Sequence, residues 1–282
     1  MTPSATEAPL KTWLAPAKIN LFLHITGRRA DGYHELQSIF QFLDYADELT
    51  FKIIPQAEIV HTNPISGVDV DKDLSVRAAR LLQRYSRCRL GAEIHINKKL
   101  PLGGGLGGGS SDAATTLVAL NQLWYLGLDK PTLAELGRQL GADVPVFVHG
   151  HTAWAEGVGE KLTPVEIDEP WYVIIIPPVS ISTAEIFSAK ELNRKCVAIK
   201  IAQYLTGATE NVCEAVVRKR YPQVNNAIEW LNQYSKARMT GTGACVFAPL
   251  SSEQRAVEVL REKPEGYAGF VAKGRNVSPL YE

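Results

Sequence analysis

Hydrophobic and polar residues alternate over 17–26, which predicts a β-strand near the start of the chain. The odd-numbered positions from 19 to 25 are aliphatic, whereas Lys18 and Asn20 lie on the opposite face. Residues 28–33 contain an Asp-Gly turn signal and predict a loop after this strand. Other short patterns predict strands over 50–54, 92–97, 144–149, 172–176, 244–247 and 267–272.

Helical periodicity predicts helices between these strands. The first is expected to begin at Asp71 or Asp73 and to end near Tyr85, burying Tyr85 together with three leucines. A second is expected to begin after Asp129, a fair N-cap, with Pro131 in its first turn. The remaining helices are predicted over 112–126, 184–206, 210–219, 223–235 and 252–262.

Strands and helices are mixed in both halves of the 282 residues, which indicates an α+β architecture. Pro164, Asp168 and Pro170 interrupt the pattern near 160–168. This interruption predicts two domains, 1–165 and 166–282.

Composition narrows the class of protein. Lys+Arg and Asp+Glu both number 30, and this balance argues against binding to nucleic acid or to an anionic membrane. The four cysteines have no Cys-x-x-Cys spacing, so we expect reduced thiols. No apolar run reaches the roughly 20 residues of a membrane span, and the first residues lack the pattern of a targeting segment. We expect a cytoplasmic protein.

A glycine-rich loop is the strongest chemical signal. Residues 101–114 read PLGGGLGGGSSDAA, and six of positions 103–109 are glycine. Glycines let a ligand approach the main chain, whose free N–H groups can surround an anion. Ser110, Ser111 and Asp112 are expected to open a helix, whose N-terminus favours phosphate.

Other interpretations of this loop are weaker. A flexible linker does not normally lead straight into a capped amphipathic helix. A Walker A loop would need lysine after its last glycine, where Ser110 stands. Gly103, Gly105 and Gly108 satisfy the G-x-G-x-x-G spacing, but Asp129 lies at a helix start rather than at the end of a second strand.

Asp143 precedes the apolar run Val-Pro-Val-Phe. A carboxylate in such surroundings is unfavourable unless it is paired or hydrogen-bonded, or serves a function. It could be a helix-end or turn residue bonded to nearby backbone, or it could accept or orient a substrate hydroxyl. Lys18 and Asn20 lie about 7 Å apart on one strand face. From the strand alone, Lys18 could equally be an ordinary solvated lysine. His149 and His151 have no neighbouring carboxylate or cysteine, so we expect no metal site held by protein side chains.

The glycine loop resembles the phosphate loop of the GHMP kinase superfamily (galactokinase, homoserine kinase, mevalonate kinase). Three more stretches resemble one branch of it: PAKINLFLHITGRRADGYHEL at 16–36, GADVPVFVHG at 141–150 and GTGACVFA at 241–248. That branch phosphorylates an alcohol carrying a cytidine diphosphate group in the non-mevalonate route to isoprenoids. The similarity covers essentially the whole chain.

The resemblance implies a fold and a site. The N-terminal domain is expected to be ribosomal S5 domain 2-like and the C-terminal domain ferredoxin-like. Lys18 and Asp143 would be catalytic, and the acceptor would be a small molecule with a cytidine diphosphate group. The ATP-binding residues would be Pro101, Leu102, Gly103, Gly104, Gly105, Leu106, Gly107, Gly108, Gly109, Ser110 and Ser111, and the substrate-binding residues Asn20, Tyr33, His34, Thr183 and Phe187.

Within this resemblance Tyr33 and Phe187 would stack on the cytosine and His34 would hydrogen-bond to it. Taken alone, Tyr33 and His34 could equally be surface aromatics of a loop. The Gly-Thr-Gly turn at 241–243 could contact the substrate diphosphate or be an ordinary loop. Mg²⁺ is expected with ATP, held mostly by phosphates and water, with Ser110 or Ser111 nearby.

One position departs from the family. Asp73 stands where these kinases usually have asparagine, near the nucleoside of ATP, so the nucleoside contacts are not predicted. Two alternatives remain open: another GHMP kinase acting on a mevalonate-type or sugar alcohol, and a non-catalytic nucleotide-binding module. The sequence does not predict the oligomeric state.

Overall fold

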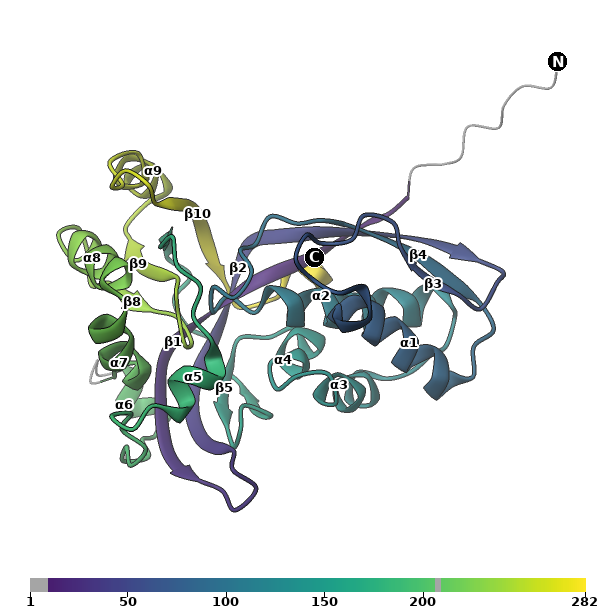
Figure 1. Ribbon diagram of the computed structural model, residues 1–282, viewed down its shortest axis with the longest axis horizontal. Helices are drawn as coiled ribbons and strands as arrows, with labels where there is room; N and C mark the ends of the chain where they lie inside the picture. The colour runs from purple at the N-terminus through teal and green to yellow at the C-terminus, as the bar shows by residue number, and fades with distance from the viewer. Residues whose placement is uncertain (1–9, 206–208) are drawn as a thin grey trace.

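A long antiparallel pair of strands runs through the middle of the molecule in the computed structural model, which describes residues 10–205 and 209–282. β1 (Thr12–Arg28) pairs with β2 (His34–Ile54). Figure 1 shows this pair passing between helices α1–α4 on one side and α6–α9 on the other. Both halves of the chain are therefore built on the same two strands.

The N-terminal half extends the sheet from β2. β4 (Gly91–Asn97) pairs antiparallel with β2, and β3 (Ile59–His61) lies parallel to β4 at the edge. β5 (Ala153–Glu156) pairs with both β2 and β6 (Lys161–Pro164). The helices of this half are α1 (Leu74–Ser86), α2 (Gly108–Leu123), α3 (Lys130–Arg138) and α4 (Val144–His149), with the 3₁₀ turn η1 (Val70–Lys72) before α1.

The C-terminal half has β7 (Trp171–Ile176) between β9 (Val246–Leu250) and β10 (Ala268–Arg275), all antiparallel. β8 (Arg238–Met239) is the edge strand, and β10 also pairs with β2, so one sheet crosses both halves. The helices are α5 (Thr183–Ser188), α6 (Ile201–Leu205), α7 (Val212–Arg220), α8 (Pro222–Leu231) and α9 (Glu253–Arg261), and the chain ends with the 3₁₀ turn η2 (Pro279–Tyr281).

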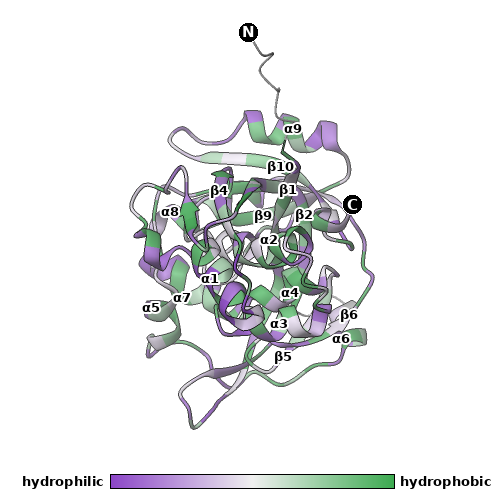
Figure 2. Cartoon of the chain, turned by 90° about the vertical axis from the view of Figure 1, so that its right-hand side faces the viewer, coloured by the Kyte–Doolittle hydropathy of each residue, from purple (hydrophilic) through white to green (hydrophobic). Residues whose placement is uncertain are grey.

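The buried side chains form three clusters. One lies under α1–α4, a second lies between the C-terminal helices and strands, and a third joins β1 and β2 to β7 and β9. Leu23 and Ile25 of β1 pack in the second cluster, among residues of the C-terminal half. In Figure 2 hydrophobic and hydrophilic residues share surface helices such as α3 and α9, as expected for helices with one buried face.

Most predicted elements are present, and the α+β class is confirmed. Asp73 and Asp129 are the N-caps of α1 and α3, because each side chain accepts hydrogen bonds from amides of the following turn. The helix predicted from 112 begins earlier, at Gly108, because Gly107 at φ +74° turns the chain into the helix inside the glycine run.

Three structural predictions are wrong. Residues 144–149 form helix α4 rather than a strand, and Pro145 occupies its first turn. The helix predicted over 184–206 is two short helices, α5 and α6, joined by irregular chain, and residue 206 lies outside the described residues. Tyr85 is 55% exposed, because it lies on the solvent side of α1.

Among the described helices, none combines the length and the apolar character that crossing a bilayer requires. The four cysteines are free thiols, as expected from their spacing.

Candidate active site

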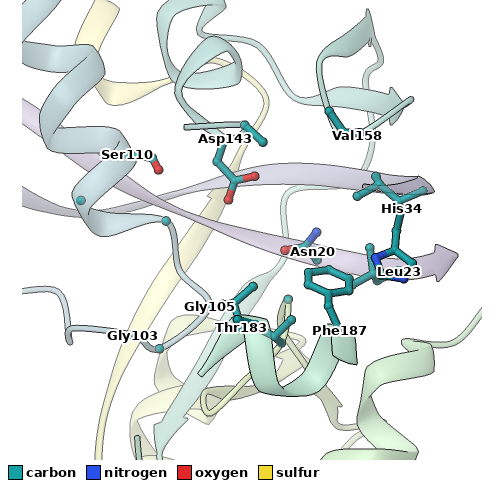
Figure 3. A pocket seen from close by; sticks show the side chains of 18 of the residues that line it. Asn20, Leu23, His34, Gly103, Gly105, Ser110, Asp143, Val158, Thr183 and Phe187 are labelled. Carbon is teal, nitrogen blue, oxygen red and sulfur yellow. Dashed lines mark hydrogen bonds between the residues drawn. The ribbon is translucent and has the colours of Figure 1, made fainter. Parts of the chain in front are cut away.

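A cavity of about 950 Å³ opens between the two halves of the molecule, beside β1. Its lining comes from the glycine loop, the first turn of α2, the residue before α4, the 31–34 loop and α5. Figure 3 shows the order of these groups: Gly103 and Ser110 at one end, Asp143 and Asn20 in the middle, and His34 and Phe187 at the other end. The cavity therefore has a glycine-lined end and an aromatic end, with one carboxylate between them.

The glycine loop is held against β1 and against the chain before β9. The amide of Lys18 donates to the carbonyl of Leu106 over 2.9 Å, and the amide of Cys245 donates to the carbonyl of Gly104 over 3.1 Å. Gly105 has φ +77°, and a Cβ there would lie 2.3 Å from the carbonyl oxygen of Thr240. Only glycine fits this approach without movement of the backbone.

The N-terminus of α2 opens into the cavity. Gly107, Gly108, Gly109 and Ser110 line it, and the first amides of a helix have no partner within the helix. The helix dipole adds partial positive charge at this end. The loop and the helix start together offer main-chain donors suited to an anion.

Asp143 lies at the N-cap position of α4 but makes no capping hydrogen bond. Its carboxylate Oδ2 is 3.2 Å from Lys18 Nζ, and the side chain is 35% exposed to the cavity. The interpretation of Asp143 as a turn residue bonded to nearby backbone is therefore wrong. Lys18 is 3% exposed, so it is not the solvated surface lysine that the strand alone allowed.

A chain of hydrogen bonds fixes the position of Lys18. Its ammonium donates to Asn20 Oδ1 over 2.7 Å, and Asn20 Nδ2 donates to Ser38 Oγ over 2.8 Å. The main-chain amide of Asn20 donates to Thr240 Oγ1 over 3.0 Å. Thr240 Oγ1 in turn donates to the carbonyl of Gly105, also over 3.0 Å. Through Asn20, these hydrogen bonds connect Lys18 to β2, to the glycine loop and to the C-terminal half of the chain.

Aromatic rings line the far end of the cavity. The rings of His34 and Phe187 stack with centroids 5.2 Å apart and an interplanar angle of 19°. Tyr33 also lines the cavity and is 63% exposed. Thr183 Oγ1 lies 2.9 Å from Thr242 Oγ1, which joins the start of α5 to the 241–243 turn.

Burial lowers the pKa of His34 below the ordinary histidine value of 6.5, and the positive charges of Arg194 and Arg28 lower it further. His34 is therefore neutral at pH 7. A neutral imidazole can donate from one nitrogen and accept at the other.

A cluster of buried ion pairs lies beside the glycine loop. Lys98 Nζ contacts Asp47 Oδ2 at 2.6 Å and Asp112 Oδ2 at 2.5 Å. Asp47 Oδ1 also accepts from the amides of Lys99 and Leu100, just before the loop. Burial and Asp47 raise the pKa of Asp112 to about 7, although Lys98 opposes this shift. The cluster joins β2, the loop and α2.

The structure brings nearly all the predicted site residues together. Every one lines the cavity except Leu106 and Ser111, whose side chains are buried. Asp73 does not line it either; its carboxylate caps α1, and the neighbouring Leu74 is the cavity residue. Thr240 and Arg194 could not be predicted from the sequence, since nothing in the local pattern distinguishes them from other residues of a loop.

Two family models match the chain. The GHMP kinases N terminal domain matches residues 73–151, and the GHMP kinases C terminal matches residues 194–268. The first match contains the glycine loop and Asp143.

Relatives match over almost the full length. A 4-diphosphocytidyl-2-C-methyl-D-erythritol kinase of Nitrosococcus oceani is 56% identical over 270 residues, covering 96% of each chain. The protein of the same name from Shewanella halifaxensis is 54% identical, covering 97% of each chain. A crystal structure of 4-(cytidine 5'-diphospho)-2C-methyl-D-erythritol kinase has a TM-score of 0.79 at 30% identity, covering 94% of this chain and 99% of that one. The mevalonate kinase of Methanococcus jannaschii shares the fold, with a TM-score of 0.71 at 19% identity, covering 96% of this chain and 100% of that one.

Proposed function

The chain belongs to the GHMP kinases and, within them, to the 4-diphosphocytidyl-2-C-methyl-D-erythritol kinases, and from that premise we propose how its cavity works. ATP and the cytidyl alcohol occupy opposite ends of the cavity. The γ-phosphate passes to the 2-hydroxyl of the alcohol, a step of the non-mevalonate route to isoprenoid precursors.

One observation carries this proposal. The Lys18–Asp143 pair lies between the glycine loop and the stacked rings of His34 and Phe187. A phosphoryl-transfer enzyme needs the donor phosphate and the acceptor hydroxyl to meet at a charged centre. The order of groups along this cavity supports that arrangement.

We assign the triphosphate of ATP to the glycine loop. The amides of residues 103–109 and the first turn of α2 are the donors, and the helix dipole favours the negative charge. The buried cluster of Asp47, Lys98 and Asp112 keeps these amides in place.

Gly109→Ala is expected to raise the KM for ATP about 10-fold. Gly109 is exposed, lies in the first turn of α2 and lines the cavity, so its new methyl group would narrow the path of the phosphates. A Cβ there meets only Leu74 Cδ1, at 3.5 Å, so the fold tolerates it. Steady-state kinetics with each substrate varied in turn would measure the effect.

The second substrate provides the internal control for Gly109→Ala. The KM for the cytidyl alcohol and the melting temperature should stay near the wild-type values, because alanine is a better helix residue than glycine. Equal losses for both substrates would contradict the assignment of this loop to ATP.

We assign proton handling to Asp143 and charge stabilisation to Lys18. Asp143 accepts the proton of the 2-hydroxyl or orients that hydroxyl toward the γ-phosphate. Lys18 stabilises the ionised carboxylate and the charge that develops on the attacking oxygen. Asn20 holds Lys18 and contacts the substrate.

Mg²⁺ fits the site as a partner of ATP. Among the described residues, no three His, Cys, Asp or Glu side chains converge to hold a metal. Ser110 and Asp143 line the cavity and carry oxygen atoms, the ligands that Mg²⁺ prefers, so they would hold an ATP-bound Mg²⁺ together with phosphate oxygens and water. When bound, Mg²⁺ neutralises phosphate charge; the residues of the chain orient the reacting groups.

We assign the cytosine to the aromatic end. Tyr33 and Phe187 provide stacking surfaces, His34 hydrogen-bonds to the base, and Thr183 with the 241–243 turn lies near the diphosphate. Stacking contributes on the order of 1–3 kcal/mol per base, enough to favour a nucleotide-linked alcohol over a bare one.

His34→Ala is expected to raise the KM for the cytidyl alcohol about 10- to 30-fold, through loss of one hydrogen bond and one ring contact. The KM for ATP should not change, because the glycine loop lies at the other end of the cavity. His95→Ala is the matched control, since His95 is exposed on β4. Parallel loss of affinity for both substrates would contradict the assigned role.

A kinase assay with a panel of alcohols tests the proposed function directly. Cytidyl-linked methylerythritol should be phosphorylated, whereas the untagged alcohol, mevalonate and sugar alcohols should not. Turnover of mevalonate would favour a different GHMP activity, and nucleotide binding without turnover of any alcohol would favour a non-catalytic module. The stacked rings at the far end of the cavity speak against both outcomes.

We further propose that residues 1–165 supply ATP binding and the catalytic pair, and that residues 166–282 complete the substrate end. The free cysteines support a cytoplasmic location, because a reducing compartment keeps thiols unpaired. The balanced charge supports partners that are small molecules rather than nucleic acid or membrane.

A further inference from the structure

Arg194 connects the irregular chain after α5 to the proposed base-binding end of the cavity. Its Nε donates to His34 Nε2 over 3.1 Å. Its Nη2 donates to the carbonyls of Phe187 and Ala189 over 2.9 and 2.7 Å, and Nη1 donates to the carbonyl of Leu192 over 3.2 Å. One half-buried guanidinium therefore binds both the ring of His34 and the main chain of its stacking partner Phe187.

The chemistry of this contact fixes the hydrogen on His34. A guanidinium has donors and no acceptor, and it stays protonated in proteins. His34 Nε2 must therefore present its lone pair to Arg194 Nε, and a neutral His34 then carries its hydrogen on Nδ1. His34 lines the cavity, and no described residue is hydrogen-bonded to its Nδ1.

We propose that Arg194 is a positioning residue for substrate specificity: it holds His34 as the Nδ1–H tautomer, so that the cavity presents a fixed donor to the base. Cytosine offers two adjacent acceptors, N3 and O2, to such a donor. This inference rests on the proposed function, since it concerns the cytidyl end of that site.

The charges around His34 favour its neutral form. Arg194 and Arg28 are the charged groups that act on its ring, and both disfavour the imidazolium. Glu35, the next residue in the chain, directs its carboxylate to Arg29 at 3.6 Å. The stacking partner Phe187 carries no charge. His34 consequently stays neutral, with one tautomer, across the neutral pH range.

NMR of the free, ¹⁵N-labelled enzyme tests the tautomer without any substrate. Two-bond ¹H–¹⁵N spectra should show Nδ1 of His34 protonated and Nε2 unprotonated, with the signal assigned by its loss in His34→Gln. In Arg194→Met both tautomers should be populated. A wild-type His34 protonated on Nε2 would overturn the proposal, whether or not the enzyme phosphorylates the cytidyl alcohol.

Kinetics separate this role from simple support of the fold. Arg194→Met should raise the KM for the cytidyl alcohol about 5- to 30-fold at pH 8, with kcat and the KM for ATP within twofold of wild type. As the pH is lowered below the ordinary histidine pKa of 6.5, the ratio of mutant to wild-type KM should fall toward one, because an imidazolium carries hydrogen on both nitrogens. A purely structural loss would not be reversed by acid.

Arg220→Met is the matched control. Arg220 pairs with Glu185 of α5 and with Glu191. The substitution therefore removes a guanidinium near α5 and the chain that follows it, but leaves the contact with His34 in place. Its KM for the cytidyl alcohol should equal that of wild type at every pH. A similar defect in Arg220→Met, or a ratio for Arg194→Met that does not change with pH, would overturn the role of Arg194.

Discussion

Asp143→Asn is expected to lower kcat about 10²- to 10⁴-fold. The carboxylate makes no capping bond to α4, faces the cavity and lies 3.2 Å from Lys18, so its charge is available to the reaction. Asparagine keeps the shape of the side chain but cannot accept the hydroxyl proton. Rapid-quench or steady-state kinetics would measure kcat, and both KM values should stay within a few-fold of wild type.

Asp129→Asn is the matched control for this change. Asp129 caps α3 through the amide of Thr132, and asparagine is an equally good N-cap. The same chemical substitution should therefore leave kcat unaltered there. Turnover of Asp143→Asn at the wild-type rate would remove Asp143 from the mechanism and leave positioning by the loop as the source of catalysis.

The site could be predicted from the sequence where its chemistry depends on local spacing. The glycine loop is contiguous, and Lys18 and Asn20 are two residues apart on one strand. The burial of Lys18 could not be predicted in this way. Leu106, which accepts from the amide of Lys18, and Thr240, which accepts from the amide of Asn20, are distant in sequence. The alternation of β1 also does not reveal that both of its faces are buried.

The two wrong elements have identifiable physical causes. A run of five apolar residues, 144–148, fits a buried strand or a buried helix equally well, and Pro145 with the packing of α4 against α2 and α3 decides for the helix. Beyond α5 the periodicity favours a continuing helix, but Arg194 binds the carbonyls of Phe187 and Ala189. The Arg194 side chain thus occupies carbonyls that the amides of a further helical turn would have bound.

Lys18→Met is expected to lower kcat about 10²- to 10³-fold, because the ammonium that faces both Asp143 and the reacting oxygen is lost. Methionine has a similar length, but it leaves the buried Asn20 Oδ1 without its donor, so the free energy of unfolding is expected to fall by about 1–3 kcal/mol. The loss of kcat is therefore measured at a temperature where circular dichroism shows the variant to be folded. Lys273→Met on β10 is the control, since that ammonium lies over the ring of Trp171, outside the cavity lining.

The double variant Lys18→Met/Asp143→Asn distinguishes one catalytic unit from two separate contributions. If Lys18 acts by stabilising the Asp143 carboxylate and the charge beside it, removing both should cost about as much as the worse single change, since residues that act as a unit are strongly non-additive. Multiplying losses in kcat would mean instead that Lys18 acts on the phosphate independently of Asp143. The 3.2 Å ion pair, and the hydrogen bond that holds Lys18 on Asn20, favour the single unit.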